Sequence, residues 1–186
     1  MKVFIQKEFF SEVYYSWATF AKNKSVPFTI TDEQQNADLK ISSDKDSDLY
    51  ISNKFFSALK NRQLNHESIL SESMLVKDDS DRIDYLSSVF YLINSLQEMG
   101  SNAKDELGRF LFNKSYQQKF NSATENIVQL HFDNMCRTIP KFRSFNDNSR
   151  KTRIFLSHDI DTVNGALLQD SFFALKKGRI DWLMSL

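Results

Sequence analysis

The stretch Arg153-Ile154-Phe155-Leu156-Ser157-His158-Asp159-Ile160-Asp161 places one imidazole and two carboxylates directly after an apolar segment. Its first four residues have the character of a short buried strand. α/β proteins place chemistry at strand ends, because the backbone is rigid there while the side chains face solvent or ligand. The stretch therefore predicts an α/β fold with a functional site at the end of this strand.

Two interpretations of the carboxylate pair stay open. On an extended backbone Asp159 and Asp161 share one face, where two carboxylates repel each other unless a cation or a proton lies between them. A divalent metal satisfies this requirement, with one carboxylate as ligand and the other placed to deprotonate a metal-bound water. Alternatively, one of the two carboxylates caps the helix that follows the strand.

The residues before this stretch alternate between strand and helix patterns. Apolar residues that recur at three- and four-residue steps predict helices, at residues 7–22, 53–59, 83–99 and 121–136. Short apolar runs predict strands, at residues 3–5, 28–30, 39–42 and 49–51. Strand-helix-strand order at this spacing favours a small mixed sheet with flanking helices.

Several residues suggest where the elements end. Asn53 is placed to cap the second helix, Gly100 stands where a helix C-cap belongs, and Pro140 is expected to end the fourth helix. The polar, basic stretch at 141–151 resembles a connector between two structural units, with Phe142 as one of its apolar anchors.

Composition excludes several classes of protein. The chain has 186 residues with 24 basic and 24 acidic side chains, so the net charge gives no reason to expect nucleic acid or an anionic membrane as a partner. The single cysteine, Cys136, excludes an intramolecular disulfide and is expected to be buried. No apolar run approaches the ~18 residues of a membrane span, and the N-terminus lacks the apolar core of a signal peptide. We therefore expect a cytoplasmic protein without a membrane span.

Two other groups of polar residues are weaker candidates. The carboxylates at 44–48 have calcium-loop spacing, but Leu49 replaces the required glycine and Phe55 the required glutamate, which favours a solvated loop. No two histidines have helical ligand spacing; His66 is expected to be exposed and His131 to have a structural role.

The stretch at 153–161 resembles the first motif of a branch of polysaccharide deacetylase-like proteins, in which the usual Thr-Phe-Asp-Asp-Gly is replaced by Thr-His-Asp-Val-Asp. The segments 84–94 and 105–110 are similar to the N-terminal accessory region of these bacterial proteins. The resemblance implies an accessory α/β domain at 1–145. It also implies that residues 146–186 form the first strand and helix of a deacetylase-type β/α barrel.

What the resemblance implies for function is a metal-dependent hydrolase that removes acyl groups from N-acylated sugars. Asp159 and Asp161 match the general base and the metal ligand, in either order, and His158 is the third candidate ligand for Zn²⁺ or another divalent metal. Residues 162–186 contain no histidine, so the family's His-x-x-x-His motif is missing. We therefore expect the N-terminal part of a longer hydrolase, inactive alone. The alternatives are a non-catalytic α/β module that binds a glycan or a protein, and an enzyme complete in itself.

Overall fold

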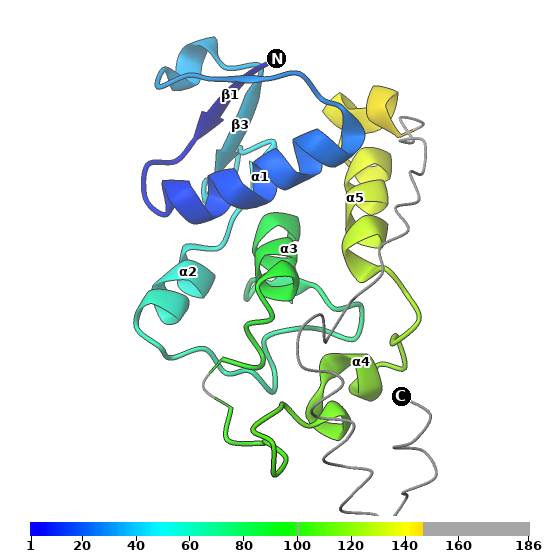
Figure 1. The fold of residues 1–186 in the computed structure, drawn as a ribbon. Helices are drawn as coiled ribbons and strands as arrows, with labels where there is room; N and C mark the ends of the chain where they lie inside the picture. The colour runs from blue at the N-terminus through cyan, green and yellow to red at the C-terminus, as the bar shows by residue number, and fades with distance from the viewer. Residues whose placement is uncertain (100, 147–186) are drawn as a thin grey trace, which may run out of the picture. The chain divides into compact units, whose positions relative to one another are not determined.

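The computed structural model describes residues 1–99 and 101–146 (Figure 1). Its main sheet has the strand order β2-β1-β3-β4, and all neighbouring strands are parallel. Its strands are β1 Lys2–Ile5, β2 Thr29–Ile30, β3 Leu39–Ser42 and β4 Leu49–Tyr50. The four predicted strands are thus confirmed within one residue at each end, but the sheet is parallel throughout rather than mixed.

Antiparallel pairing occurs in a separate hairpin that the sequence patterns did not predict. Strands β5 (Val76–Lys77) and β6 (Ile83–Asp84) pair across the turn at residues 78–82. Each strand is two residues long, too short to show an alternating pattern. The turn is held by Asp78, whose carboxylate accepts the backbone N–H groups of Ser80 and Arg82.

The helices of the described residues are of two types. Five are α-helices: α1 Phe10–Lys24, α2 Asn53–Lys60, α3 Tyr85–Ile93, α4 Tyr116–Lys119 and α5 Ile127–Thr138. Three are short 3₁₀ helices: η1 Gln34–Asn36, η2 Phe112–Lys114 and η3 Pro140–Phe145. The predicted helices α1, α2, α3 and α5 are therefore confirmed, whereas α4 and the 3₁₀ helices were not predicted.

Several predicted helix ends are wrong. Helix α2 is capped by Ser52, whose hydroxyl accepts the N–H of Phe55, and Asn53 is its first residue. Helix α3 ends at Ile93 rather than 99, because Ser95 adopts a left-handed backbone (φ 48°) that helical residues do not. Helix α5 begins at Ile127 after the cap Asn126, six residues later than predicted.

One face of the sheet forms the centre of the core. Residues of adjacent strands that share this face are all at most 5% exposed: Val3, Ile5, Leu39, Ile41 and Leu49. Figure 1 shows α1 beside β1 and β3, and α1 also packs against α3. The buried stripe of α1, which includes Val13, Trp17 and Phe20, supplies the apolar surface that this packing requires.

Aromatic side chains join the end of the described chain to this core. The Phe142 ring in η3 lies 5.7 Å from the Trp17 ring and 5.2 Å from the Phe20 ring, measured between centroids. The Phe132 ring of α5 lies 5.4 Å from the Phe20 ring. The predicted connector at 141–151 is therefore wrong for its first residues, because η3 continues to Phe145 and buries Phe142 completely.

A partly buried ion pair joins α1 to α5. The ammonium of Lys24 lies 2.5 Å from the Asp133 carboxylate, and the two side chains are 4% and 28% exposed. Gln129 donates a second hydrogen bond to the same carboxylate, and its carbonyl oxygen accepts one from Asn23. The ammonium lowers the pKa of Asp133 even though burial opposes this.

We expect Asp133→Asn to lower the free energy of unfolding by about 1–2 kcal/mol, because Lys24 stays buried while its anionic partner becomes neutral. Asp79→Asn is the matched control: the Lys54–Asp79 pair is 78% and 86% exposed, so its loss should change stability by less than about 0.5 kcal/mol. Urea unfolding of both variants measures the difference. Equal effects would show that burial does not strengthen the Lys24–Asp133 pair.

In residues 1–99 and 101–146, none of the helices has the length and apolarity needed to cross a membrane.

Candidate functional site

The residues predicted to carry the chemistry, His158, Asp159 and Asp161, lie outside the described residues. The same is true of the predicted barrel strand and helix at 146–186, apart from residue 146. In the described part of the chain, no group of three or more His, Cys, Asp or Glu side chains is arranged to hold a metal ion. The acidic run at 44–48 lies in the loop between β3 and β4, where Asp44 and Asp46 both pair with Lys40.

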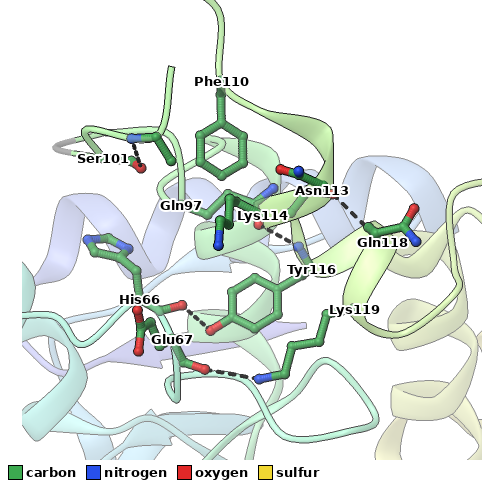
Figure 2. A pocket seen from close by; sticks show the side chains of 12 residues that line it. His66, Glu67, Gln97, Ser101, Phe110, Asn113, Lys114, Tyr116, Gln118 and Lys119 are labelled. Atoms are coloured by element: carbon green, nitrogen blue, oxygen red, sulfur yellow. Dashed lines mark hydrogen bonds between the residues drawn. The ribbon is translucent and has the colours of Figure 1, made fainter. Parts of the chain in front are cut away.

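The described residues do form a cavity of about 720 Å³ (Figure 2). Its walls come from two segments that are distant in sequence: the loop around His66 and Glu67, and the region from Gln97 to Lys119. Small-molecule sites occupy concave spaces of about 300–1,000 Å³. The cavity therefore has the size of a ligand site, and it is our candidate functional site.

Two hydrogen bonds hold the walls of the cavity together. The Tyr116 hydroxyl donates to the backbone carbonyl of His66, and the Lys119 ammonium donates to that of Glu67 at 3.1 Å. Figure 2 shows both bonds side by side, running from α4 to the loop. Because Tyr116 is 4% exposed, its ring fixes the loop from the protein interior.

Gln97 holds the other side of α4 in place. Its side-chain carbonyl accepts the backbone N–H of Tyr116 at 3.0 Å, and its NH₂ group donates to the Gln117 side chain at 3.0 Å. Ser115 caps α4 by accepting the N–H of Gln118. Short helices are marginal without tertiary contacts, so these bonds explain how a four-residue helix can line a wall.

His66 contributes an imidazole to the cavity lining. Its Nδ1 lies 3.0 Å from the hydroxyl of Tyr91, which is 1% exposed. Burial lowers the pKa of His66 below its ordinary value and raises the pKa of Tyr91. Both groups are therefore neutral at pH 7, and the imidazole has one donor and one acceptor nitrogen. The predicted exposed His66 is thus wrong: the structure packs one edge of the ring against a buried tyrosine.

The rim of the cavity is polar, apart from one aromatic ring. Asn113, Lys114 and Gln118 are exposed, and Phe110 is half-buried. The backbone position of Phe110 is set by a bridge to Lys104, across a turn in which Gly108 has φ 78°. Figure 2 shows the Phe110 ring over the part of the cavity lined by Gln97 and Asn113.

Sequence reasoning missed this site because its residues form no motif. His66 and Tyr116 are 50 residues apart, and the segment between them includes the buried helix α3. The one available signal was the polar character of residues 101–119, which lacks a long apolar stripe although it is folded.

Asp84 is a completely buried carboxyl group outside the cavity lining. Its carboxylate is 0% exposed and accepts the backbone N–H groups of Ser52 at 2.5 Å and Ser87 at 2.9 Å, and the Ser87 hydroxyl at 2.5 Å. Burial raises its pKa to about 6, while these donors oppose the shift. All of its bonds join the N-terminal ends of α2 and α3, so Asp84 is a structural residue.

His131 is structural as well, as predicted. Its Nε2 lies 3.0 Å from the Met74 carbonyl, which can only accept, so Nε2 carries the proton. Burial lowers the pKa of His131, and its Nδ1 has no hydrogen-bond partner in the described residues. The imidazole therefore stays neutral and anchors Met74, two residues before β5, to α5.

The chain was compared with protein families, curated proteins and solved structures. The model of a family of unknown function, DUF7033, matches residues 1–143. The chain belongs to this family. The DUF7033 match spans the parallel sheet, the cavity and most of η3, and ends before the motif at 153–161. No curated protein and no solved structure is similar enough to the chain to match it.

Proposed function

We propose that this chain is the N-terminal part of a polysaccharide deacetylase-like, metal-dependent hydrolase that acts on N-acylated sugars. The observation that carries this proposal is the sequence Ser157-His158-Asp159-Ile160-Asp161 directly after an apolar strand pattern. In this proposal, residues 1–145 are an accessory domain and residues 146–186 open the catalytic domain. The position of the DUF7033 match, entirely before this motif, agrees with such a division.

The side chains of His158, Asp159 and Asp161 are of the types that bind zinc. Carboxylates and imidazole are ordinary zinc ligands, and a catalytic zinc needs three protein ligands plus an open position. Asp159 and Asp161 would supply one ligand and one general base, and His158 is the third candidate. A bound zinc would lower the pKa of a water to make a nucleophile at neutral pH. The carboxylate that is not a ligand would accept the proton of that water.

The coding sequence past Leu186 and the activity of the complete gene product test this proposal. We expect a His-x-x-x-His motif downstream, and zinc-dependent release of acetate from a tetramer of N-acetylglucosamine. Asp159→Asn and Asp161→Asn should each reduce the rate by about 100-fold or more, because each removes a base or a ligand. Asp170→Asn is the matched control outside the motif.

The 186-residue chain alone should release no acetate above the level of the Asp159→Asn/Asp161→Asn double variant, and calorimetry should detect weak zinc binding or none. A tight one-to-one zinc site that is lost in Asp161→Asn, together with acetate release, would show that the chain is a complete enzyme. The proposed hydrolase function would be wrong if the complete gene product showed no zinc-dependent release of acetate.

The second candidate function is a non-catalytic module that binds a glycan or a protein. The cavity between the His66 loop and α4 favours it, because the cavity is large enough for a ligand and is built without the 153–161 motif. The two functions are compatible, since an accessory domain can bind the polymer on which a neighbouring catalytic domain acts.

A further inference from the structure

We propose that the cavity between the His66 loop and α4 binds a saccharide unit, with the apolar face of the sugar ring against Phe110 and its hydroxyl groups bonded to Asn113, Gln118 and His66. The proposed saccharide site rests on the second candidate function and deepens it by naming the binding residues and the ligand class. Every residue of the site lies in the described part of the chain, away in sequence from Asp159 and Asp161.

The polar groups around the cavity suit a ligand that both donates and accepts hydrogen bonds. The side-chain amides of Asn113 and Gln118 each have donors and an acceptor. The neutral imidazole of His66 adds its Nε2, since its Nδ1 is already bonded to the Tyr91 hydroxyl. In the described residues, the two amides and the Lys114 ammonium have no hydrogen-bond partner. Sugar hydroxyls have this same dual character.

The charges of the cavity argue against a polyanion. Glu67 contributes one carboxylate against the ammonium groups of Lys114 and Lys119. Lys119 is already bonded to the Glu67 backbone carbonyl, and its ammonium lies 5.1 Å from the centre of the Phe120 ring. Phosphate and nucleic-acid sites instead gather several cations with no opposing carboxylate. A ligand with little or no net charge fits this balance better.

The apolar part of the lining suits a sugar ring better than a peptide or a lipid. Phe110 is half-buried and is the more accessible of the two large rings in the lining, because Tyr116 is almost completely buried. One accessible aromatic ring is enough to pack against the C–H groups on one face of a sugar. A peptide is usually bound at a free strand edge or in a groove with several apolar anchors. The walls here are a loop, η2 and α4, and no main-sheet strand lines the cavity.

The walls are held in place without a ligand, which favours binding. Tyr116 fixes the loop through the His66 carbonyl, and Gln97 fixes the backbone of Tyr116. Tyr91 fixes the position of the His66 ring. A site whose residues are already ordered loses less conformational entropy when the ligand binds.

Isothermal titration calorimetry of the 186-residue chain tests the site, with tetramers of glucose, glucosamine and N-acetylglucosamine as probes. We expect at least one tetramer to bind, and Phe110→Ala to weaken this binding by about tenfold, the effect of losing one aromatic contact. Asn113→Ala combined with Gln118→Ala should weaken it as well. Phe112→Ala is the matched control, because Phe112 is 55% exposed in the same segment but does not line the cavity.

Absence of binding by all three tetramers would overturn the proposal. So would tetramer binding that Phe110→Ala leaves unchanged, because the ligand would then lie elsewhere; circular dichroism confirms that each variant is folded. Binding of an unfolded peptide in place of every tetramer, lost in Phe110→Ala, would reassign the cavity to a protein partner. Acetate release by the complete gene product is scored separately, so the saccharide site and the hydrolase can fail independently.

Discussion

Phe142→Ala is expected to lower the free energy of unfolding by about 3–5 kcal/mol, the cost of removing a fully buried aromatic ring. Phe142 is 0% exposed and contacts both Trp17 and Phe20. Its loss would leave a void between α1 and η3 that these large, rigid rings cannot fill. Urea unfolding followed by circular dichroism at 222 nm measures the change.

The Phe142 variant also tests whether η3 belongs to the domain core. Phe145→Ala, in the same 3₁₀ helix but only partly buried, should cost less than half as much. Phe112→Ala at an exposed position should be nearly neutral. If Phe142→Ala were as mild as Phe112→Ala, η3 would be a connector, as the polar sequence of this stretch predicts.

Asp84→Ala is expected to lower the free energy of unfolding by about 3 kcal/mol at pH 5. Each oxygen of the Asp84 carboxyl accepts one buried backbone N–H, from Ser52 and Ser87. Removal of the carboxyl leaves both of these donors without their acceptor, and each such loss costs about 1–3 kcal/mol. Asp79→Ala, at an exposed carboxylate, is the control and should have almost no effect.

The effect of Asp84→Ala should depend on pH. Burial raises the pKa of Asp84 from 3.8 to about 6, so the folded protein binds this proton more tightly than the unfolded chain does. The contribution of Asp84 to stability is therefore complete below pH 3.8 and is lost as the pH rises to about 6. The difference between wild type and Asp84→Ala should shrink by about 1 kcal/mol from pH 5 to pH 7. A difference that grows with pH would show that the hydrogen bonds outweigh desolvation.

Local patterns were sufficient for the longer elements. The stripe that contains Val13, Trp17 and Phe20 has helical spacing. The structure confirms the helix as α1, in which all three side chains are buried. Leu39 and Ile41 alternate with polar Lys40, as expected for β3. In each case the pattern reflects which side of the element is buried, and burial is the main source of its stability.

Helix ends were predicted less well, because they depend on single side chains and backbone angles. Ser52 and Asn53 are both good N-cap residues, and only the structure shows that the Ser52 hydroxyl accepts the bond. Asp84 follows an apolar isoleucine and was assigned to a helix, although it ends β6 and caps α3.

The sequence by itself determined the alternation of strands and helices, the burial of Cys136 and the structural role of His131. It also supplied the motif at 153–161, whose function stays a prediction. Only the tertiary structure decided the parallel order of the sheet, the burial of Phe142 and the cavity between His66 and α4. The physical reason is that periodicity records which side of a segment is apolar. Periodicity does not show which distant segments form the walls of one cavity. That depends on contacts such as the hydrogen bond between the Tyr116 hydroxyl and the His66 carbonyl, which produce no periodic pattern in the sequence.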